Sequence, residues 1–107
     1  MKLTPRRGEV WLVDMGMVEK TRPAVILSGQ PDDADRNLVT VIPHTTTLRG
    51  SAFEIAIDLP FLKPGAFLTQ SPATLPSIRA ERLLGRITEE QLRRVEDGLL
   101  RWLQIKR

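Results

Sequence analysis

Few side chains in this sequence could carry acid–base or nucleophilic chemistry. His44 is the single histidine among 107 residues and there is no cysteine, so a histidine pair, a thiolate nucleophile, a thiolate zinc site and a disulfide framework are all excluded. Asp32, Asp33 and Asp35 lie close together, but the remaining ligands of a calcium loop are missing, and a solvated turn is the better interpretation. No glycine-rich phosphate loop occurs, and no serine has a suitably placed histidine. We therefore expect no bound metal and no cofactor.

Arginine and hydroxyl side chains are the chemistry that remains. RNA carries its own nucleophile, the 2′-OH next to each phosphate, so a site that cuts RNA needs mainly to bind the phosphate and stabilise the charge that gathers on it. The forked guanidinium of arginine matches phosphate oxygens, and a preorganised donor of this kind contributes about 10²–10³ in rate. Arg22 is the candidate, because it precedes Pro23 at the end of a loop and the start of an expected strand. Position and charge alone leave an ordinary surface arginine as the more common alternative.

Composition and charge describe a small globular chain. Its 107 residues fit one domain, residues 1–107, and 41% hydrophobic and 27% charged residues are ordinary for such a domain. A core of this size is marginal, so a shared dimer surface would supplement it. The net charge of +3 is compatible with nucleic acid as a partner. The first residues lack the apolar stretch of a signal peptide and no run approaches the length of a membrane span, so we expect a cytoplasmic protein with no membrane partner.

Most of the chain is predicted to form short strands joined by turns that are rich in glycine, proline and aspartate. Strand-forming apolar runs of this length and spacing are typical of a small antiparallel barrel. The expected strands are Glu9–Asp14, Pro23–Ser28, Leu38–Thr45, Phe53–Ile57, Ala66–Gln70 and, interrupted by a glycine, Leu83–Ile87.

The last part of the sequence has helical periodicity. Thr88 and Gln91 have the spacing of a capping box, which marks a helix start. Apolar residues then recur every three or four positions, which predicts an amphipathic helix packed on the barrel. These residues are Leu92, Val95, Leu99, Trp102 and Leu103. Gly98 lies inside the pattern at a cost of about 1 kcal/mol relative to alanine. Trp11 and Trp102 are both expected in the core.

Two blocks of the sequence resemble the MazF/PemK family of toxins. The first is Arg7–Asp14 (RGEVWLVD) followed by Arg22–Ser28 (RPAVILS), which is similar to the family's RGE(I/V)W strand and its following RP strand. The second is Val41–Ile55 (VIPHTTTLRGSAFEI), which is similar to the family's V-P-x-T-(T/S) … (K/R)-G … F-E-V segment. A third block, Gly65–Leu75, matches less well. Together the blocks span most of the chain.

The resemblance implies a fold, an activity and a set of site residues. Members of the family are toxins of type II toxin–antitoxin pairs that cut single-stranded RNA at short sequences without a metal, leaving a 2′,3′-cyclic phosphate and a 5′-OH. It implies a mainly β, SH3-like antiparallel barrel with a C-terminal amphipathic helix, a homodimer, and an antitoxin whose acidic, disordered tail blocks the RNA groove. By position, the essential arginine is Arg22, which binds the phosphate and assists proton transfer, and the essential threonine is Thr45. The further residues expected to bind the substrate are Thr46, Thr47, Arg49, Gln70 and Ser71.

Strand geometry bears on the role of His44. Side chains alternate between the two faces of a strand, so if Thr45 points to the site, His44 and Thr46 point away while Thr47 shares the face of Thr45. We expect a structural role for His44 unless the strand bulges at Pro43.

Three departures from the family pattern fall at substrate-facing positions. The loop before Arg22 is shortened to residues 16–21, where the family usually has a G-x-E-Q-x-G stretch. In the third block Gln70 replaces the family's carboxylate and cannot act as a general base, and Ala73 replaces a basic residue. We expect altered cleavage specificity rather than lost activity, since Arg22 and Thr45 both remain. Candidates to replace the lost positive charge are Arg49, Lys63 and Arg79.

Two other functions remain as alternatives. A related barrel family of gyrase-binding toxins has the same architecture and poisons a protein target without catalysis. A plain nucleic-acid-binding barrel is the other alternative, but it would need exposed aromatic side chains for stacking, and the chain has only two tryptophans, three phenylalanines and no tyrosine.

Overall fold

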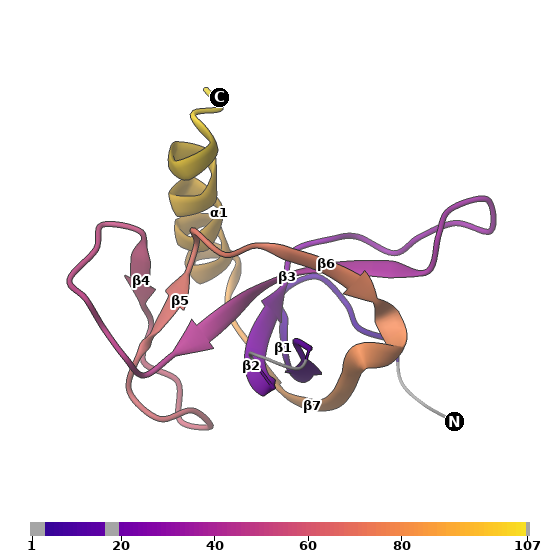
Figure 1. Cartoon of the computed structure of the whole chain (residues 1–107), viewed down its shortest axis with the longest axis horizontal. Helices are drawn as coiled ribbons and strands as arrows, with labels where there is room; N and C mark the ends of the chain where they lie inside the picture. The colour runs from indigo at the N-terminus through magenta and orange to yellow at the C-terminus, as the bar shows by residue number, and fades with distance from the viewer. Residues whose placement is uncertain (1–3, 17–19, 107) are drawn as a thin grey trace.

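The computed structural model describes residues 4–16 and 20–106, which form an antiparallel sheet and a C-terminal helix (Figure 1). The strands are β1 (Glu9–Asp14), β2 (Thr21–Ile26), β3 (Leu38–Thr45), β4 (Glu54–Ala56), β5 (Ala66–Leu68), β6 (Ala73–Pro76) and β7 (Ala80–Arg86). A 3₁₀ turn, η1 (Ser77–Arg79), precedes β7, and α1 spans Glu89–Leu103. The strand order is β4-β5-β3-β2-β1-β7, with β6 paired to the first half of β3. The sheet is barrel-like but not closed, and the mainly β fold with its C-terminal helix is the one predicted.

Most strands lie where the sequence predicted them. β1 and β3 have the predicted bounds, β2 starts earlier at Thr21, β4 and β5 are shorter, and β7 is longer than expected. β6 was not predicted. Its four residues, ATLP, end in a proline and are at most half-buried, so they lack the apolar run that indicates a strand.

Side chains of the central strands alternate between two hydrophobic clusters on opposite faces of the sheet. The first cluster contains Val25 of β2 and Ile42 of β3, which lie opposite each other. The second cluster contains Ala24, Val41 and the buried Trp11, whose core position was predicted. Because the side-chain period of a strand is two, a one-residue slip between β2 and β3 would bring side chains of one cluster beside those of the other and disrupt both.

α1 covers the first cluster and begins with the predicted capping box. Leu92 and Val95 are buried in that cluster. The Thr88 hydroxyl accepts a hydrogen bond from the Gln91 backbone N–H at 3.1 Å, and the Gln91 side-chain oxygen accepts one from the Thr88 backbone N–H at 2.8 Å. Two of the backbone N–H groups at the start of the helix region are thereby satisfied.

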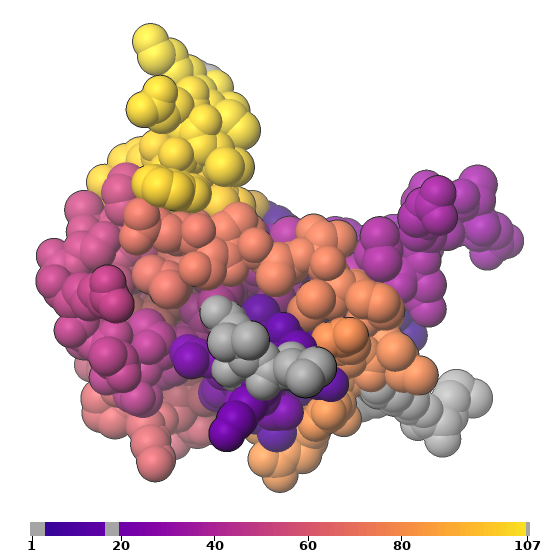
Figure 2. Space-filling view, in the orientation of Figure 1, coloured from indigo at the N-terminus to yellow at the C-terminus, as the bar shows by residue number. Residues whose placement is uncertain are grey.

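The helix packs closely against the sheet at Gly98 and then projects beyond it (Figures 1 and 2). A Cβ on Gly98 would lie 3.0 Å from the side chain of Thr69, so the glycine permits this close packing. Trp102 is 43% exposed and Leu103 is exposed as well, so the prediction that Trp102 lies in the core was wrong. Its ring instead lies edge-on to Phe53, with 5.4 Å between centroids. No helix in the described part of the chain is long and apolar enough to cross a membrane.

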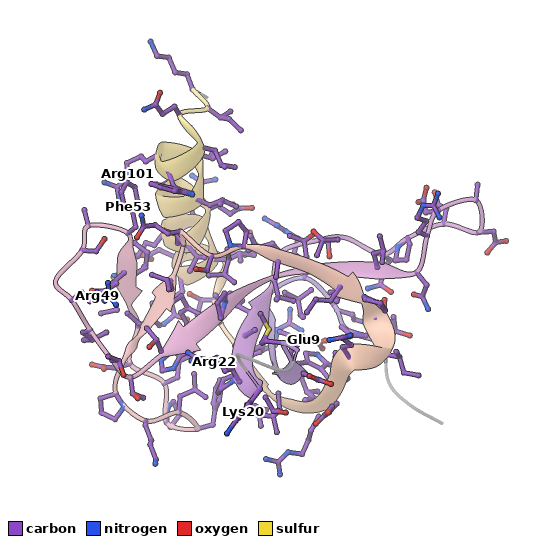
Figure 3. All side chains as sticks on the ribbon, in the orientation of Figure 1. Glu9, Lys20, Arg22, Arg49, Phe53 and Arg101 are labelled. Atoms are coloured by element: carbon purple, nitrogen blue, oxygen red, sulfur yellow. The ribbon has the colours of Figure 1, made fainter. Side chains whose placement is uncertain are left out.

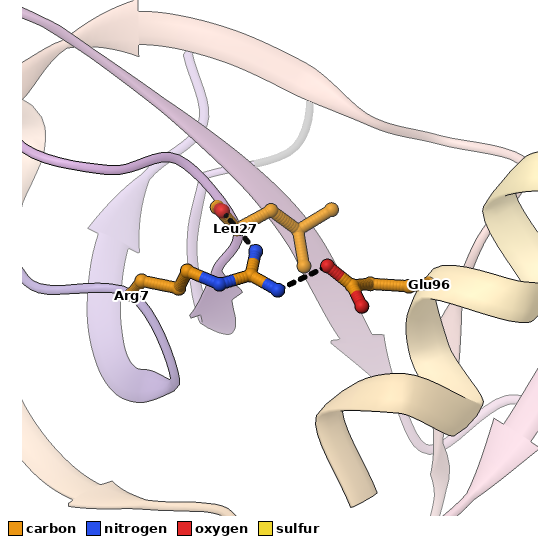
Figure 4. A network of polar contacts seen from close by, with 3 residues as sticks. All are labelled: Arg7, Leu27 and Glu96. Atoms are coloured by element: carbon orange, nitrogen blue, oxygen red, sulfur yellow. Dashed lines mark hydrogen bonds and ion pairs between the residues drawn. The ribbon is translucent and has the colours of Figure 1, made fainter. Parts of the chain in front are cut away.

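Arg7 joins the segment before β1 to the helix (Figure 4). Its guanidinium donates a hydrogen bond to the Leu27 backbone carbonyl at 2.6 Å and forms an ion pair with Glu96 of α1. An ion pair exposed to this degree contributes at most about 1 kcal/mol. Its main effect is to connect residues that are 89 positions apart in the chain.

Thr88→Ala is expected to lower the free energy of unfolding by about 1 kcal/mol, because the exposed hydroxyl acts through its capping bond rather than through packing. Urea denaturation followed by circular dichroism measures the change. Thr88→Ser keeps the hydroxyl and is the matched control. Equal losses in both variants would contradict the capping role.

Candidate active site

Arg22 of β2 and Thr45 of β3 occupy neighbouring strands in the middle of the sheet. Ala24 pairs with Pro43, and the same register continued by two residues sets Arg22 opposite Thr45. Directly opposite residues on antiparallel strands have Cβ atoms about 4.5–5.5 Å apart. Both residues are partly buried and belong to the sheet face of the second cluster. The sheet thus holds an arginine and a threonine on one face of neighbouring strands.

A first recess of about 280 Å³ opens over this pair. It brings together most of the residues that the sequence singled out, from three different parts of the chain. Its lining residues are Arg22, Pro43, Thr45, Thr47, Arg49, Ser51, Glu54, Leu68, Gln70 and Ser71. Thr46, expected among the substrate-binding residues, is not part of it. Among the described residues no three histidine, aspartate or glutamate side chains are grouped so that they could hold a metal ion.

A second recess of about 570 Å³ lies on the other side of the same pair. Arg22, Thr45 and Thr47 line both recesses. In Figure 3 Arg22 stands between Arg49, which lines the first recess, and Lys20, which lines the second. The residues found only in the second recess are Leu12, Lys20, Thr21, Pro23, His44, Thr46, Phe61, Leu62, Lys63, Arg82 and Leu84.

Glu54 organises the turn that carries Arg49, and sequence reasoning missed it. Its carboxylate accepts hydrogen bonds from the backbone N–H groups of Arg49 at 2.9 Å and Ser51 at 3.0 Å. These bonds, first of all the one from Arg49, hold the pKa of Glu54 below its ordinary 4.5. Glu54 lies five positions after Arg49, in the FEI stretch of the second block. The sequence therefore shows that the two residues are close along the chain, but their hydrogen bonds depend on how the turn folds.

Thr45 is fixed by its neighbours. Its hydroxyl accepts a hydrogen bond from the Thr47 backbone N–H at 3.1 Å and contacts the Thr47 carbonyl at 3.5 Å. On the other side, β5 begins directly against it, since Thr45 pairs with Ala66. A Cβ on Gly65 would lie 2.2 Å from the Thr45 carbonyl oxygen, so only glycine fits there.

His44 lies on the opposite face from Thr45, as the regular alternation of β3 requires. The strand pairs with β2 and β5 without a bulge at Pro43. The imidazole is only 4% exposed and lies edge-on to Phe67 with 5.1 Å between ring centroids. Burial lowers the pKa of His44 below its ordinary 6.5, so the ring is neutral at neutral pH. Its Nε2 is buried and makes no hydrogen bond within the described part of the chain.

The positions that depart from the family pattern are separated by the fold. Gln70 lines the first recess, whereas Ala73 lies in β6, opposite Val41 and away from both recesses. Of the three candidate replacement charges, Arg49 lines the first recess and Lys63 the second. Arg79 lies 4.0 Å from the Asp14 carboxylate and lines neither. The middle of the shortened loop, residues 17–19, lies outside the described residues.

Comparison with known protein families identifies the family of the chain that forms this sheet. Residues 6–103 match the family described as PemK-like, MazF-like toxin of type II toxin–antitoxin system. The chain belongs to this family. The family predicted from the two sequence blocks is therefore confirmed.

Individual relatives agree with this assignment. A curated relative, the probable endoribonuclease MazF5 of Mycobacterium tuberculosis, is 38% identical over 58 residues, which is 54% of this chain and about half (52%) of the relative. A MazE–MazF crystal structure from Deinococcus radiodurans superposes with a TM-score of 0.81 at 20% identity, covering 98% of this chain and 100% of that one. The Mycobacterium tuberculosis toxin MazF-mt6 gives 0.78 at 24% identity, covering 92% and 99%. At these identities the structures establish the shared fold.

Glu54→Gln is expected to loosen the Arg49–Ser51 turn, because an amide has one acceptor oxygen where the carboxylate has two. Backbone hydrogen exchange at Arg49 and Ser51 should speed up, while β1–β3 amides keep their protection. Glu81→Gln, an exposed change on β7, is the control. Unchanged exchange at the turn would contradict the role given to Glu54.

The same turn should respond to acid in a defined direction. Because the pKa of Glu54 is lowered on folding, its contribution is fully present above about pH 4.5 and is lost as the pH falls through the lowered value. Exchange at Arg49, corrected for its intrinsic pH dependence, should therefore stay constant from neutral pH down to pH 5 and accelerate only below the ordinary pKa. Loosening already between pH 7 and 5 would contradict this.

Proposed function

We propose that this chain is a metal-independent endoribonuclease that cuts single-stranded RNA at the Arg22–Thr45 pair. The observation that supports this most directly is that Arg22 and Thr45, on neighbouring strands, line both recesses. An RNA strand lying across the two recesses would place one phosphate over the pair. The family supplies the biological setting, a toxin of a toxin–antitoxin pair.

In the proposed reaction the RNA supplies the nucleophile. The 2′-OH attacks the adjacent phosphorus, losing its proton, and the bond from phosphorus to O5′ breaks as O5′ takes up a proton. The products are a 2′,3′-cyclic phosphate and a 5′-OH. Atoms balance without a metal or a covalent enzyme intermediate. The protein therefore has to position the phosphate and stabilise the charge of the transition state.

Each nearby side chain has a defined part in this scheme. The guanidinium of Arg22 donates to the non-bridging phosphate oxygens as a fork. The Thr45 hydroxyl, already accepting from Thr47, gives up its long contact with the Thr47 carbonyl and donates to the phosphate. Arg49 on its turn adds a second positive charge, and Gln70 and Ser71 offer neutral hydrogen bonds to the strand.

Two protein partners complete the proposal, which places the chain in the cytoplasm. The first is a cognate antitoxin with an acidic disordered tail, whose charge suits the cations around both recesses. The second is another copy of the chain, since the exposed Trp102, Leu103 and Ile105 at the projecting end of α1 offer apolar surface for a homodimer.

Arg22→Ala is expected to lower kcat/KM for single-stranded RNA by at least about 100-fold, because the phosphate loses its preorganised charged donor. Cleavage is measured in chelator with purified, antitoxin-free protein, and the new ends are mapped for 5′-OH groups. Arg93→Ala, an exposed arginine of α1, is the control and should cut normally. If folded wild-type protein cleaves no RNA, the nuclease is wrong, and gyrase inhibition in the same preparation would favour a protein-directed poison.

A further inference from the structure

The second recess is more than an extension of the phosphate position. With about 570 Å³ it has the volume of a typical small-ligand pocket, and it reaches from the Arg22–Thr45 pair across to β7. We infer that this recess holds the nucleotide next to the cut and that His44 reads its base. The inference rests on the proposed function, because it assumes that the phosphate lies over Arg22 and Thr45.

Charge favours an RNA strand in this recess. Four cationic side chains line it, and none of its lining residues is acidic. They are Lys20, Arg22, Lys63 and Arg82. The first recess differs, because there Glu54 accompanies Arg22 and Arg49. Because all the charged residues that line this recess are cationic, it can bind the backbone phosphates on one side of the cut.

The walls of the second recess suit a flat, apolar ring. Phe61, Leu84 and Pro23 line it together with the cations. Phe61 is held against β7, since a Cβ on Gly85 would lie 2.5 Å from its ring. A nucleobase that leaves the stack can use such aromatic and aliphatic walls, and single-stranded RNA has bases that are free to do so.

His44 supplies the polar group among these walls. His44 lines the recess although only 4% of its surface is exposed, and its buried Nε2 makes no hydrogen bond in the described part of the chain. An unpaired buried polar atom costs about 1–3 kcal/mol, so a base that moves in far enough to hydrogen-bond the enclosed imidazole is preferred over one that cannot. The ring is neutral at neutral pH, and each neutral imidazole has one donor and one acceptor nitrogen. His44 lines the same recess as Arg22 and Thr45 but points to the opposite face of β3 from Thr45, so it is a specificity-determining residue rather than part of the phosphate-binding pair.

An acidic peptide fits these observations less well than a nucleotide. Aspartate and glutamate side chains would use the cations, but they have no flat ring for the Phe61 wall and no edge with both donors and acceptors for His44. A nucleotide uses all three kinds of group at once. The single-stranded RNA strand is therefore the occupant that we assign.

The test compares His44→Phe with wild type on a single-stranded RNA library that varies each base on both sides of the cut. Phenylalanine keeps a ring against Phe67 and removes both nitrogens. We expect the wild-type preference at one position next to the cut to fall by about tenfold, with the preferences elsewhere unchanged. A structural role alone would slow all sequences equally, so an equal slowing, or an unchanged preference, would overturn the inference.

If His44→Phe does not fold, a second variant tests whether RNA occupies the recess. Lys63→Ala changes the cationic rim and not the core. It should raise KM by about fivefold or more with kcat unchanged, whereas Arg86→Ala, further along β7 and outside both recesses, should change neither. Unchanged KM in Lys63→Ala would overturn the inference, and weakened binding of an acidic peptide by the same variant would assign the recess to a protein partner.

The two hypotheses fail in different ways. A wild-type protein that cuts no RNA overturns the proposed function and this inference with it. Cleavage that depends on Arg22 but shows the same base preferences in wild type and His44→Phe overturns the inference alone.

Discussion

The register between β2 and β3 is the constraint on which both the core and the site depend. It sets Val25 against Ile42 in the first cluster and, by the same alternation, puts Arg22 and Thr45 on the other face. A one-residue shift would turn the side chains of one strand to the opposite face, so that Arg22 and Thr45 would no longer share a face and both clusters would be disrupted. The hydrophobic pattern of the two strands therefore keeps Arg22 and Thr45 together.

The parts of the site differ in how firmly they are held. The Arg22–Thr45 pair belongs to paired strands with buried neighbours, whereas Arg49, Gln70 and Ser71 come from turns at the edge of the first recess. Turns tolerate substitution more readily than central strands. Gln70 and the shortened loop, two departures that the sequence analysis noted, therefore lie outside the paired strands that hold Arg22 and Thr45.

The fold was largely predictable because the apolar runs in the sequence of the central strands are the residues that the fold buries. β1 and β3 were predicted with their bounds, since the apolar runs that define them are also buried, and the capping box of Thr88 located the helix start. β6 was missed because ATLP gains its strand form from pairing with β3, a contact distant in sequence. Trp102 was misplaced because periodicity shows which face of a helix is apolar but not where the sheet beneath it ends.

The residues of the candidate site differ in how far the sequence could predict them. Arg22 and Thr45 came from the family resemblance; the structure shows that both line the two recesses, and their catalytic role stays a prediction. Strand alternation gave the face of His44 correctly. The role of Glu54 was not predicted because its hydrogen bonds are to backbone groups, which no pattern of residue types indicates. The second recess was not predicted for a related reason. Phe61 reaches Gly85 and β7 through a loop, and nothing in the local sequence of either indicates that contact.

The contact of Arg7 with Glu96 has a consequence for the synthesis of the chain. The helix that covers the first cluster is bound by a residue 89 positions earlier in the chain. Such a contact closes a long loop, and the entropy of that loop is lost before the contact is gained. The strands between Arg7 and α1 therefore stay uncovered during synthesis until the ribosome has also made the helix.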